Sequence, residues 1–274
     1  MKPAEFDYVR PETVEDAVKA LVAGNGQARI IAGGQSLVPM LNLRLMPVSQ
    51  LVDVARIPAL RAVTETETDI SFGAGIRHAE FEDGSVPDPA HGLMRRVASR
   101  IAYRAIRNRG TIGGSAALAD PSADWVPLLI ALDARFRIEG PNGMRECSGP
   151  AMFHGPYTTA LGESDILTSI SIRRLSAKAR TGFEKIIRKA GEYPMVVACA
   201  VRDEALAISR VVLGAANRPQ IVLEHLSYWL ADPKGGPESA LHADLEQAGR
   251  TGDAYELALA KAALLRAIGQ VTLA

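Results

Sequence analysis

Two glycine-rich segments are the parts of this sequence best suited to chemistry. Ala32-Gly33-Gly34-Gln35-Ser36 and Thr111-Ile112-Gly113-Gly114-Ser115 each hold a Gly-Gly pair and end in serine. A bound pyrophosphate needs several backbone N–H groups aimed at it from close range. Glycine permits both the φ values and the close approach that a side chain would block. The pattern alone leaves two interpretations open: anion sites, which the two segments could form together, or merely tight turns.

Other chemical functions lack their residues. Gly24-Asn25-Gly26 follows a predicted helix and precedes a predicted strand, the reverse of the order in a Rossmann dinucleotide site. No Walker A sequence occurs, the histidines form no i, i+4 pair, and His78-Ala79-Glu80 lacks the downstream paired cysteines of a zinc deaminase. The sequence therefore predicts no nucleoside triphosphate hydrolysis, no metal site and no catalytic side-chain set on this chain.

The composition bounds the partners and the compartment. The 274 residues carry 31 Lys plus Arg and 31 Asp plus Glu, so no overall field attracts nucleic acid or an anionic membrane. The two cysteines, Cys147 and Cys199, are too few for a four-thiolate iron–sulfur cluster. The start of the sequence lacks the apolar region of a signal peptide, and the apolar run 125–132 is too short to cross a bilayer. We expect a cytoplasmic chain with no transmembrane segment.

The elements that must position the two segments follow from periodicity and turn residues. A surface helix begins behind a Thr13 cap, and the first glycine segment lies between a short strand and a helical turn. The second segment follows a helical stretch, and its glycines favour turns over a helix. Up to residue 172 the pattern predicts helices at 14–21, 92–107 and 125–132, the last opened by residues 120–124, and strands at 29–32, 50–54, 69–74, 135–139, 144–147 and 166–172.

A second region is expected beyond the polar, basic stretch 173–180. Before it, Asn142-Gly143 between two short strands predicts a β-hairpin. After it, the sequence predicts three strands of a small sheet at 183–187, 196–201 and 208–213, and helices at 222–230 and 255–268 that cover one face of that sheet.

Taken together, these motifs resemble those of the FAD-binding medium subunit of molybdenum hydroxylases, the group that includes aerobic carbon monoxide dehydrogenase and xanthine dehydrogenase. The resemblance extends over nearly the whole chain. Its residues are the first glycine segment continued to Met40, the second segment from Arg107 onward, Asp120-Pro121-Ser122-Ala123-Asp124, and Lys185 with Gly191-Glu192-Tyr193.

The resemblance implies an α+β fold. Residues 1–175 would form a two-part FAD-binding region of the p-cresol methylhydroxylase and vanillyl-alcohol oxidase type, with sub-parts of about 1–60 and 61–175. Residues 176–274 would form a C-terminal flavoprotein domain with a three-stranded sheet and helices.

The resemblance also implies a site for non-covalent FAD, with the pyrophosphate between the two glycine segments. Asp124 would make a polar contact, Leu167 and Lys185 would approach the flavin end, and Tyr193 would lie against the isoalloxazine. The implied site residues are Ile30, Ile31, Ala32, Gly33, Gly34, Gln35, Ser36, Leu37, Thr111, Ile112, Gly113, Gly114, Ser115, Asp124, Leu167, Lys185 and Tyr193.

Several of these residues have ordinary structural interpretations. Without the resemblance, Asp124 is a helix cap, Lys185 a solvent-facing strand residue, Leu167 part of the core and Tyr193 a surface residue in a turn. One departure from the family is visible: many relatives have Ala-His-Ala-Asp-Pro where this chain has Ala117-Leu118-Ala119-Asp120-Pro121, so Leu118 removes a polar group near the nucleotide.

Partners are implied as well. A subunit of this kind carries electrons from the [2Fe-2S] clusters of a small subunit through FAD to an external acceptor, while a large subunit holds molybdopterin–molybdenum. The assembly expected is a dimer of heterotrimers. Two alternatives stay open: a self-sufficient flavoprotein dehydrogenase or oxidase, and a flavin-free interaction subunit.

Overall fold

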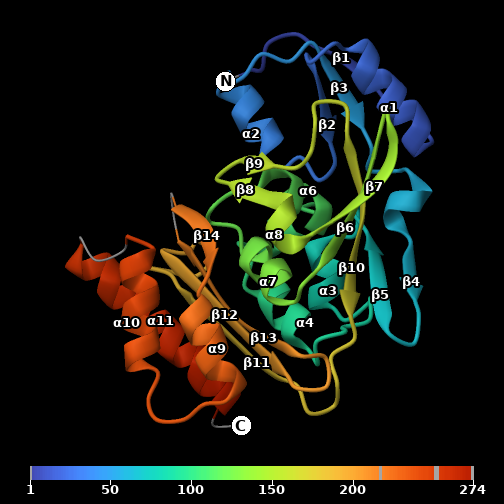
Figure 1. Cartoon of the computed structure of the whole chain (residues 1–274). Helices are drawn as coiled ribbons and strands as arrows, with labels where there is room; N and C mark the ends of the chain where they lie inside the picture. Colours follow the sequence, from blue (N-terminus) through green and yellow to red (C-terminus); the bar gives the residue numbers. More distant parts are fainter. Residues whose placement is uncertain (1, 216–217, 250–252, 273–274) are drawn as a thin grey trace.

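The computed structural model describes residues 2–215, 218–249 and 253–272 (Figure 1). Its N-terminal part is a three-stranded parallel sheet in the order β1-β3-β2. Thr13 caps the first helix as predicted, since its Oγ1 accepts a hydrogen bond from the Asp16 amide, and the apolar stripe of that helix is buried. The elements are β1 Asp7–Val9, α1 Val14–Ala23, β2 Ala28–Ile31, α2 Leu37–Asn42 and β3 Gln50–Asp53.

The middle part is a five-stranded antiparallel sheet in the order β4-β5-β10-β6-β7. The Asn142-Gly143 hairpin joins β6 to β7 as predicted, with Gly143 at a φ of 95°. The elements are the 3₁₀ helix η1 Pro58–Arg61, β4 Val63–Glu65, β5 Asp69–Gly73, α3 His78–Glu82, α4 Leu93–Ser99, α5 Arg104–Arg107, α6 Ile112–Leu118, α7 Trp125–Ala131, β6 Arg135–Gly140, β7 Gly143–Ser148, α8 Gly149–Met152, β8 Phe153–Gly155, β9 Thr158–Thr159 and β10 Ile166–Arg173.

The C-terminal part is a four-stranded antiparallel sheet with helices (Figure 1). Alternate residues of β12, which spans Val196–Asp203, face opposite sides of the sheet. Val197 and Cys199 join the core around α7, whereas Val196 and Ala198 join the core under α9 to α11. Burial on both faces explains the continuous apolar run of this strand. The elements are β11 Arg180–Ile186, β12 Val196–Asp203, β13 Ile208–Ala215, β14 Arg218–Val222, α9 Glu224–Ala231, α10 Glu238–Gln247 and α11 Ala254–Thr272.

The C-terminal sheet differs from the prediction in its strand number. We expected three strands, and the structure adds β14 Arg218–Val222 as the fourth. Its short polar and proline-containing sequence lacks the alternation on which strand prediction depends, and pairing with β13 supplies the order instead. Helix α10 was not predicted either. The mixed helix and sheet composition agrees with the α+β prediction.

The predicted helix over 92–107 is wrong in one respect, because it is broken into α4 and α5. Ala102 between them has a left-handed φ of 40°. The guanidinium of Arg107 donates to the carbonyl oxygens of Ile101 and Ala102, at 2.7 and 3.0 Å, so the acceptors of the break are satisfied by a side chain.

Within the part of the chain that the structure describes, no helix has the length and apolar character needed to cross a bilayer.

Candidate functional site: two glycine segments and a buried ion pair

The first glycine segment lies against Arg109 and Gly110, the two residues directly before the second segment, although the two segments are far apart in the sequence. The first segment follows β2 and leads into α2, and its Gly33 faces the backbone of Arg109 and Gly110. A Cβ at Gly33 would lie 2.2 Å from the Arg109 carbonyl oxygen, so only glycine allows this approach. The Gly33 oxygen also accepts from Gln35 Nε2 at 3.3 Å and from Arg109 Nε at 3.4 Å.

The first segment presents backbone donors without acceptors. Within the described residues, the amides of residues 33–37 donate no hydrogen bond, and all of these residues are half-buried. Gly34 has a φ of 73°, a conformation that glycine adopts readily. Consecutive amides in a tight turn before a helix form a concavity suited to an anion.

The second segment is not a turn, contrary to our prediction, but the beginning of α6. Thr111 is the N-cap, and its Oγ1 accepts from the Gly114 amide at 3.0 Å. Gly113 packs so tightly on Ala74 that a Cβ would lie 2.3 Å from the Ala74 Cβ. Gly114 is exposed, and a Cβ there would meet only Thr111 Oγ1. The sequence signal failed because glycine was needed here for close packing and open space, not for positive φ.

His78 supports the second segment, and sequence reasoning assigned it no role. Its amide donates to the Gly110 oxygen at 3.0 Å, its ring lies against the Gly110 α-carbon, and its Nδ1 accepts from the Trp125 indole N–H at 2.9 Å. Burial, assisted by the charge of Arg107, lowers the pKa of His78 to about 3, so the ring is neutral at pH 7. No sequence spacing signals this contact, because His78 and Trp125 lie on different helices.

Asp124 and Lys185 form a buried ion pair that joins α7 to the C-terminal sheet. Lys185 Nζ donates to Asp124 Oδ2 at 2.8 Å and to the Arg100 carbonyl oxygen at 2.9 Å, while Arg100 Nη2 donates to the Lys185 oxygen at 2.9 Å. Burial raises the pKa of Asp124, and the charge of Lys185 opposes that rise. The second carboxylate oxygen of Asp124 is buried and has no hydrogen-bond partner among the described residues.

These contacts argue against the ordinary structural interpretations, in which Asp124 is a helix cap and Lys185 faces solvent. Asp124 precedes α7 at its N-cap position, yet its side chain makes no capping hydrogen bond. Lys185 is 3% exposed, so it is not a solvent-facing strand residue. A carboxylate oxygen buried without a donor is an unsatisfied acceptor, which a bound group with an N–H or O–H donor would satisfy.

Two tyrosines lie at the same end of the site. Tyr193 is 68% exposed. Partial burial is the main cause that raises its pKa, and the negative charges of Asp120 and Asp124 add to the rise. Tyr157 is also exposed, and its amide donates to the Ala119 oxygen at the end of α6 at 2.9 Å. Partial burial and the neighbouring Asp120 raise the pKa of Tyr157. No motif in the sequence marks Tyr157.

Leu167 lies in the core of the five-stranded sheet, on β10, where it is 5% exposed. The β10 ladder is irregular between Leu167 and Ser169, and the Thr168 oxygen accepts from the Ala74 amide at 2.9 Å. The Ala74 oxygen in turn accepts from the Gly113 amide. Two backbone hydrogen bonds therefore connect Thr168, the neighbour of Leu167, to the second glycine segment.

Comparisons with known proteins agree on one family. Residues 4–174 match the family described as the FAD binding domain in molybdopterin dehydrogenase. This chain belongs to that family. It is 34% identical over 222 residues, which are 79% of this chain and 75% of the relative, to the 6-hydroxypseudooxynicotine dehydrogenase complex subunit alpha of Paenarthrobacter nicotinovorans.

Solved structures extend the likeness to the full length. The chain superimposes on carbon monoxide dehydrogenase from Hydrogenophaga pseudoflava with a TM-score of 0.89 and 30% identity, covering 99% of this chain and 98% of that one. For quinoline 2-oxidoreductase from Pseudomonas putida 86 the TM-score is 0.85 at 30% identity, with 99% and 98% covered.

The family assignment confirms the resemblance found in the sequence. It confirms the predicted fold class and identifies the chain as an oxidoreductase flavoprotein subunit with an FAD-binding domain. Another relative is the carbon monoxide dehydrogenase medium chain of Hydrogenophaga pseudoflava, which is 33% identical over 219 residues, 79% of this chain and 76% of the relative.

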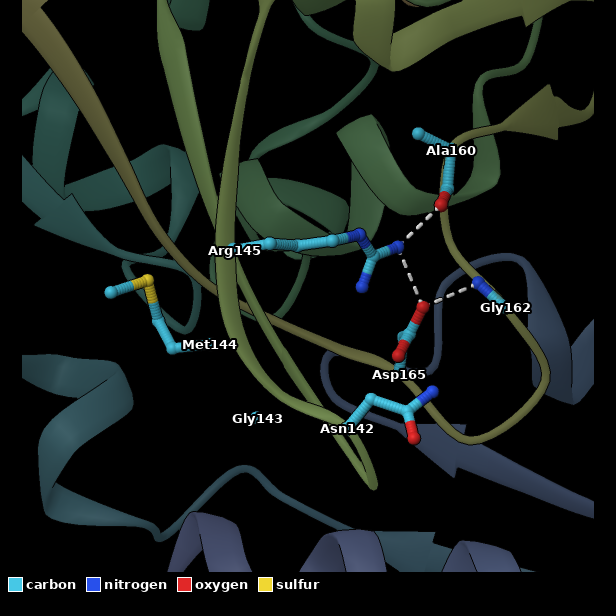
Figure 2. Close-up of a pocket in the computed structure, with 7 residues that line it drawn as sticks. All are labelled: Asn142, Gly143, Met144, Arg145, Ala160, Gly162 and Asp165. Atoms are coloured by element: carbon cyan, nitrogen blue, oxygen red, sulfur yellow. Dashed lines mark hydrogen bonds and ion pairs between the residues drawn. The ribbon is translucent and has the colours of Figure 1, made fainter.

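A separate pocket opens beside the β6–β7 hairpin of this FAD-binding chain (Figure 2). It has a volume of about 350 Å³ and is bounded by the Arg145–Asp165 ion pair, whose atoms lie 2.7 Å apart. The Gly162 amide donates to the same carboxylate at 2.7 Å. None of the predicted site residues lines this pocket, so it is not the predicted nucleotide site.

Proposed function

We propose that this chain binds FAD non-covalently and relays electrons from the iron–sulfur clusters of a small partner subunit to an external acceptor. A large partner subunit would hold molybdopterin–molybdenum and oxidise the substrate. FAD, when bound, supplies two-electron redox chemistry, whereas the chain's own residues bind and orient it. The proposal deepens the family assignment by giving the subunit a place in an electron path.

The observation that carries the proposal is the packing of Gly33 on Arg109 and Gly110, which directly precede the second glycine segment. Two further observations support it: the amides of residues 33–37 donate no hydrogen bond within the described residues, and Gly114 at the start of α6 is exposed. Together with the unpartnered Asp124 oxygen, these groups fit a ligand that has an anionic centre and a donor further along.

We assign the following roles on this basis. Residues 30–37 and 111–115 hold the pyrophosphate and its neighbours, Asp124 and Lys185 form the polar end, Leu167 packs near the flavin, and Tyr193 covers the isoalloxazine. No His or Cys stands in either glycine segment, which favours non-covalent attachment. The division into residues 1–175 and 176–274 is proposed with the same assignment.

The partner subunits are proposed from two facts. Two cysteines are too few for an iron–sulfur cluster with four thiolates, and the relatives carry names such as medium chain and complex subunit. The clusters must therefore be on other polypeptides if the electron path is as proposed. We further propose a dimer of heterotrimers.

The test is the absorption spectrum and composition of the purified full chain. We expect flavin absorption at one FAD per chain and a colourless pellet after acid precipitation, with FAD in the supernatant. FMN in the supernatant, or flavin that stays with the denatured protein, would contradict the cofactor assignment. Expression with its partners should give co-purification with two further polypeptides, and the mass of the complex by light scattering checks the dimer of heterotrimers.

A further inference from the structure

Tyr103 packs directly on the turn that carries Tyr193. Tyr103 is the N-cap residue of α5, and it is 59% exposed. Its ring lies so close to Gly191 that a Cβ there would be 2.3 Å from two ring carbons. Its hydroxyl donates to the Ala190 oxygen at 3.2 Å. Gly191 has a φ of 85°, a backbone conformation that favours glycine. The missing side chain also leaves the space that the Tyr103 ring occupies.

The turn itself has few other attachments. It leaves the C-terminal sheet after Ile186, and the Met195 amide closes its base by donating to the Ile186 oxygen at 2.9 Å. Inside it, Glu192 pairs with Arg188 and Lys189, whose side chains are exposed. Among the described residues, no hydrogen bond besides that of Tyr103 joins residues 188–194 to the rest of the chain. Tyr103 therefore restrains a segment that is otherwise held at its ends.

Tyr103 also belongs to the same structural body as the second glycine segment. It begins α5, and the chain continues from α5 through Gly110 to the Thr111 cap of α6. The contact with Gly191 thus ties the Tyr193 turn, which extends from the C-terminal sheet, to the part of the chain that would hold the pyrophosphate.

We propose that Tyr103 is a positioning residue that holds the 188–194 turn so that Tyr193 covers the isoalloxazine ring. The inference rests on the proposed function, because it assumes FAD in the assigned site. Tyr103 acts through Gly191 and Ala190 and does not itself touch the flavin. Loss of its ring frees the turn, and Tyr193 then spends less time in contact with the isoalloxazine.

The experiment measures flavin fluorescence per bound FAD in the full chain. Contact with an electron-rich phenol quenches flavin emission, so Tyr193→Ala should raise the yield by about twofold or more. Tyr103→Ala should raise it in the same direction, and the double variant should match Tyr193→Ala alone because both changes remove one contact. Tyr103→Phe keeps the ring on Gly191 and should stay close to the wild-type yield.

Tyr228→Ala is the matched control, since Tyr228 is 86% exposed on α9, and its yield should equal that of the wild type. A wild-type yield in Tyr103→Ala beside a raised yield in Tyr193→Ala overturns the positioning role alone. A double variant brighter than Tyr193→Ala also overturns it, because Tyr103 would then quench the flavin directly. An unchanged yield in Tyr193→Ala overturns the stacking assigned under the proposed function, and the positioning role with it. Thermal unfolding of each variant reports loss of fold separately from the emission.

Discussion

The two glycine segments look alike in sequence and differ in what their backbones do. In the first, the amides of residues 33–37 donate no hydrogen bond within the described chain. In the second, all four amides from Ile112 to Ser115 donate hydrogen bonds. The amide of Ile112 donates to the Ile76 oxygen and that of Gly113 to the Ala74 oxygen, while the amides of Gly114 and Ser115 both donate to Thr111. The first segment thus offers donors, and the second offers a supported wall with one exposed glycine.

The comparison also separates the uses of glycine. Gly33 and Gly113 are required because another backbone lies against them, whereas Gly114 faces open space apart from the Thr111 hydroxyl. A Gly-Gly pair therefore does not reveal which glycine serves the ligand and which serves the scaffold. The support of the second segment continues through His78 and Trp125 to Asp124 and Lys185.

The largest loss of stability should come from breaking the buried Asp124–Lys185 ion pair. Lys185→Met leaves Asp124 as a buried carboxylate without its counter-charge, and losing one partner of such a pair costs about 3–5 kcal/mol. The free energy of unfolding in urea at pH 7 measures it. Lys189→Met, at an exposed lysine of the next turn, should leave stability unchanged.

The same variant has an expected pH dependence. Burial already raises the pKa of Asp124, and loss of Lys185 removes the charge that opposes the rise. A raised folded-state pKa means that the folded protein binds more protons than the unfolded protein, so the destabilisation should shrink as the pH falls. A destabilisation that grows on acidification would show that Asp124 is not the uncompensated group.

A second change tests the contact between the segments. Gly33→Val forces a branched side chain into a space where even a Cβ lies 2.2 Å from the Arg109 oxygen, so the first segment must move away from Arg109. Overpacking of this kind costs about 1–3 kcal/mol, and FAD affinity should fall with the stability. Calorimetry with and without added FAD checks both. Full stability with wild-type FAD occupancy would contradict the apposition of the two segments.

His78→Gln tests the support beneath the second segment through its pH dependence. The pKa of His78 is about 3 when folded, below its ordinary value of 6.5, so the unfolded chain binds the extra proton between these values. Wild-type stability should therefore fall as the pH drops below 6.5, by up to about 1.4 kcal/mol per pH unit from this residue. Glutamine should remove that part of the slope.

Urea unfolding at pH 7, 6 and 5 measures the slopes of wild type and His78→Gln. His242→Gln, at a side chain that is 65% exposed, serves as the control and should keep the wild-type slope. Parallel slopes in wild type and His78→Gln would mean that the folded chain does not lower the pKa of His78.

The smallest effect on stability should come from Gly114→Ala, which sharpens the contrast with Gly33. Its methyl group meets only Thr111 Oγ1, so the change in unfolding free energy should stay within about 1 kcal/mol. FAD affinity should nevertheless weaken about tenfold, near 1.4 kcal/mol, because the methyl group occupies the proposed line of approach of the phosphates. Titration of the apo-chain with FAD measures it. Unchanged affinity would remove Gly114 from the site.

The sequence by itself determined the local elements and the motifs. The Thr13 cap, the hairpin at Asn142-Gly143 and the strand predicted at 196–201 follow from residue types and their spacing. The paired glycine motifs together with Lys185 and Tyr193 were enough to recognise the family, which the comparisons confirm.

Tertiary structure decided which glycine meets another backbone and which charges pair. Asp124 and Lys185 are 61 residues apart, and Tyr103 and Ala190 are 87 apart. Periodicity shows that a face is buried, but not which distant element covers it, because that depends on how all the elements pack together. The same reason explains the second segment: contact with Ala74 and the Thr111 cap made a helix from glycines that locally favour a turn.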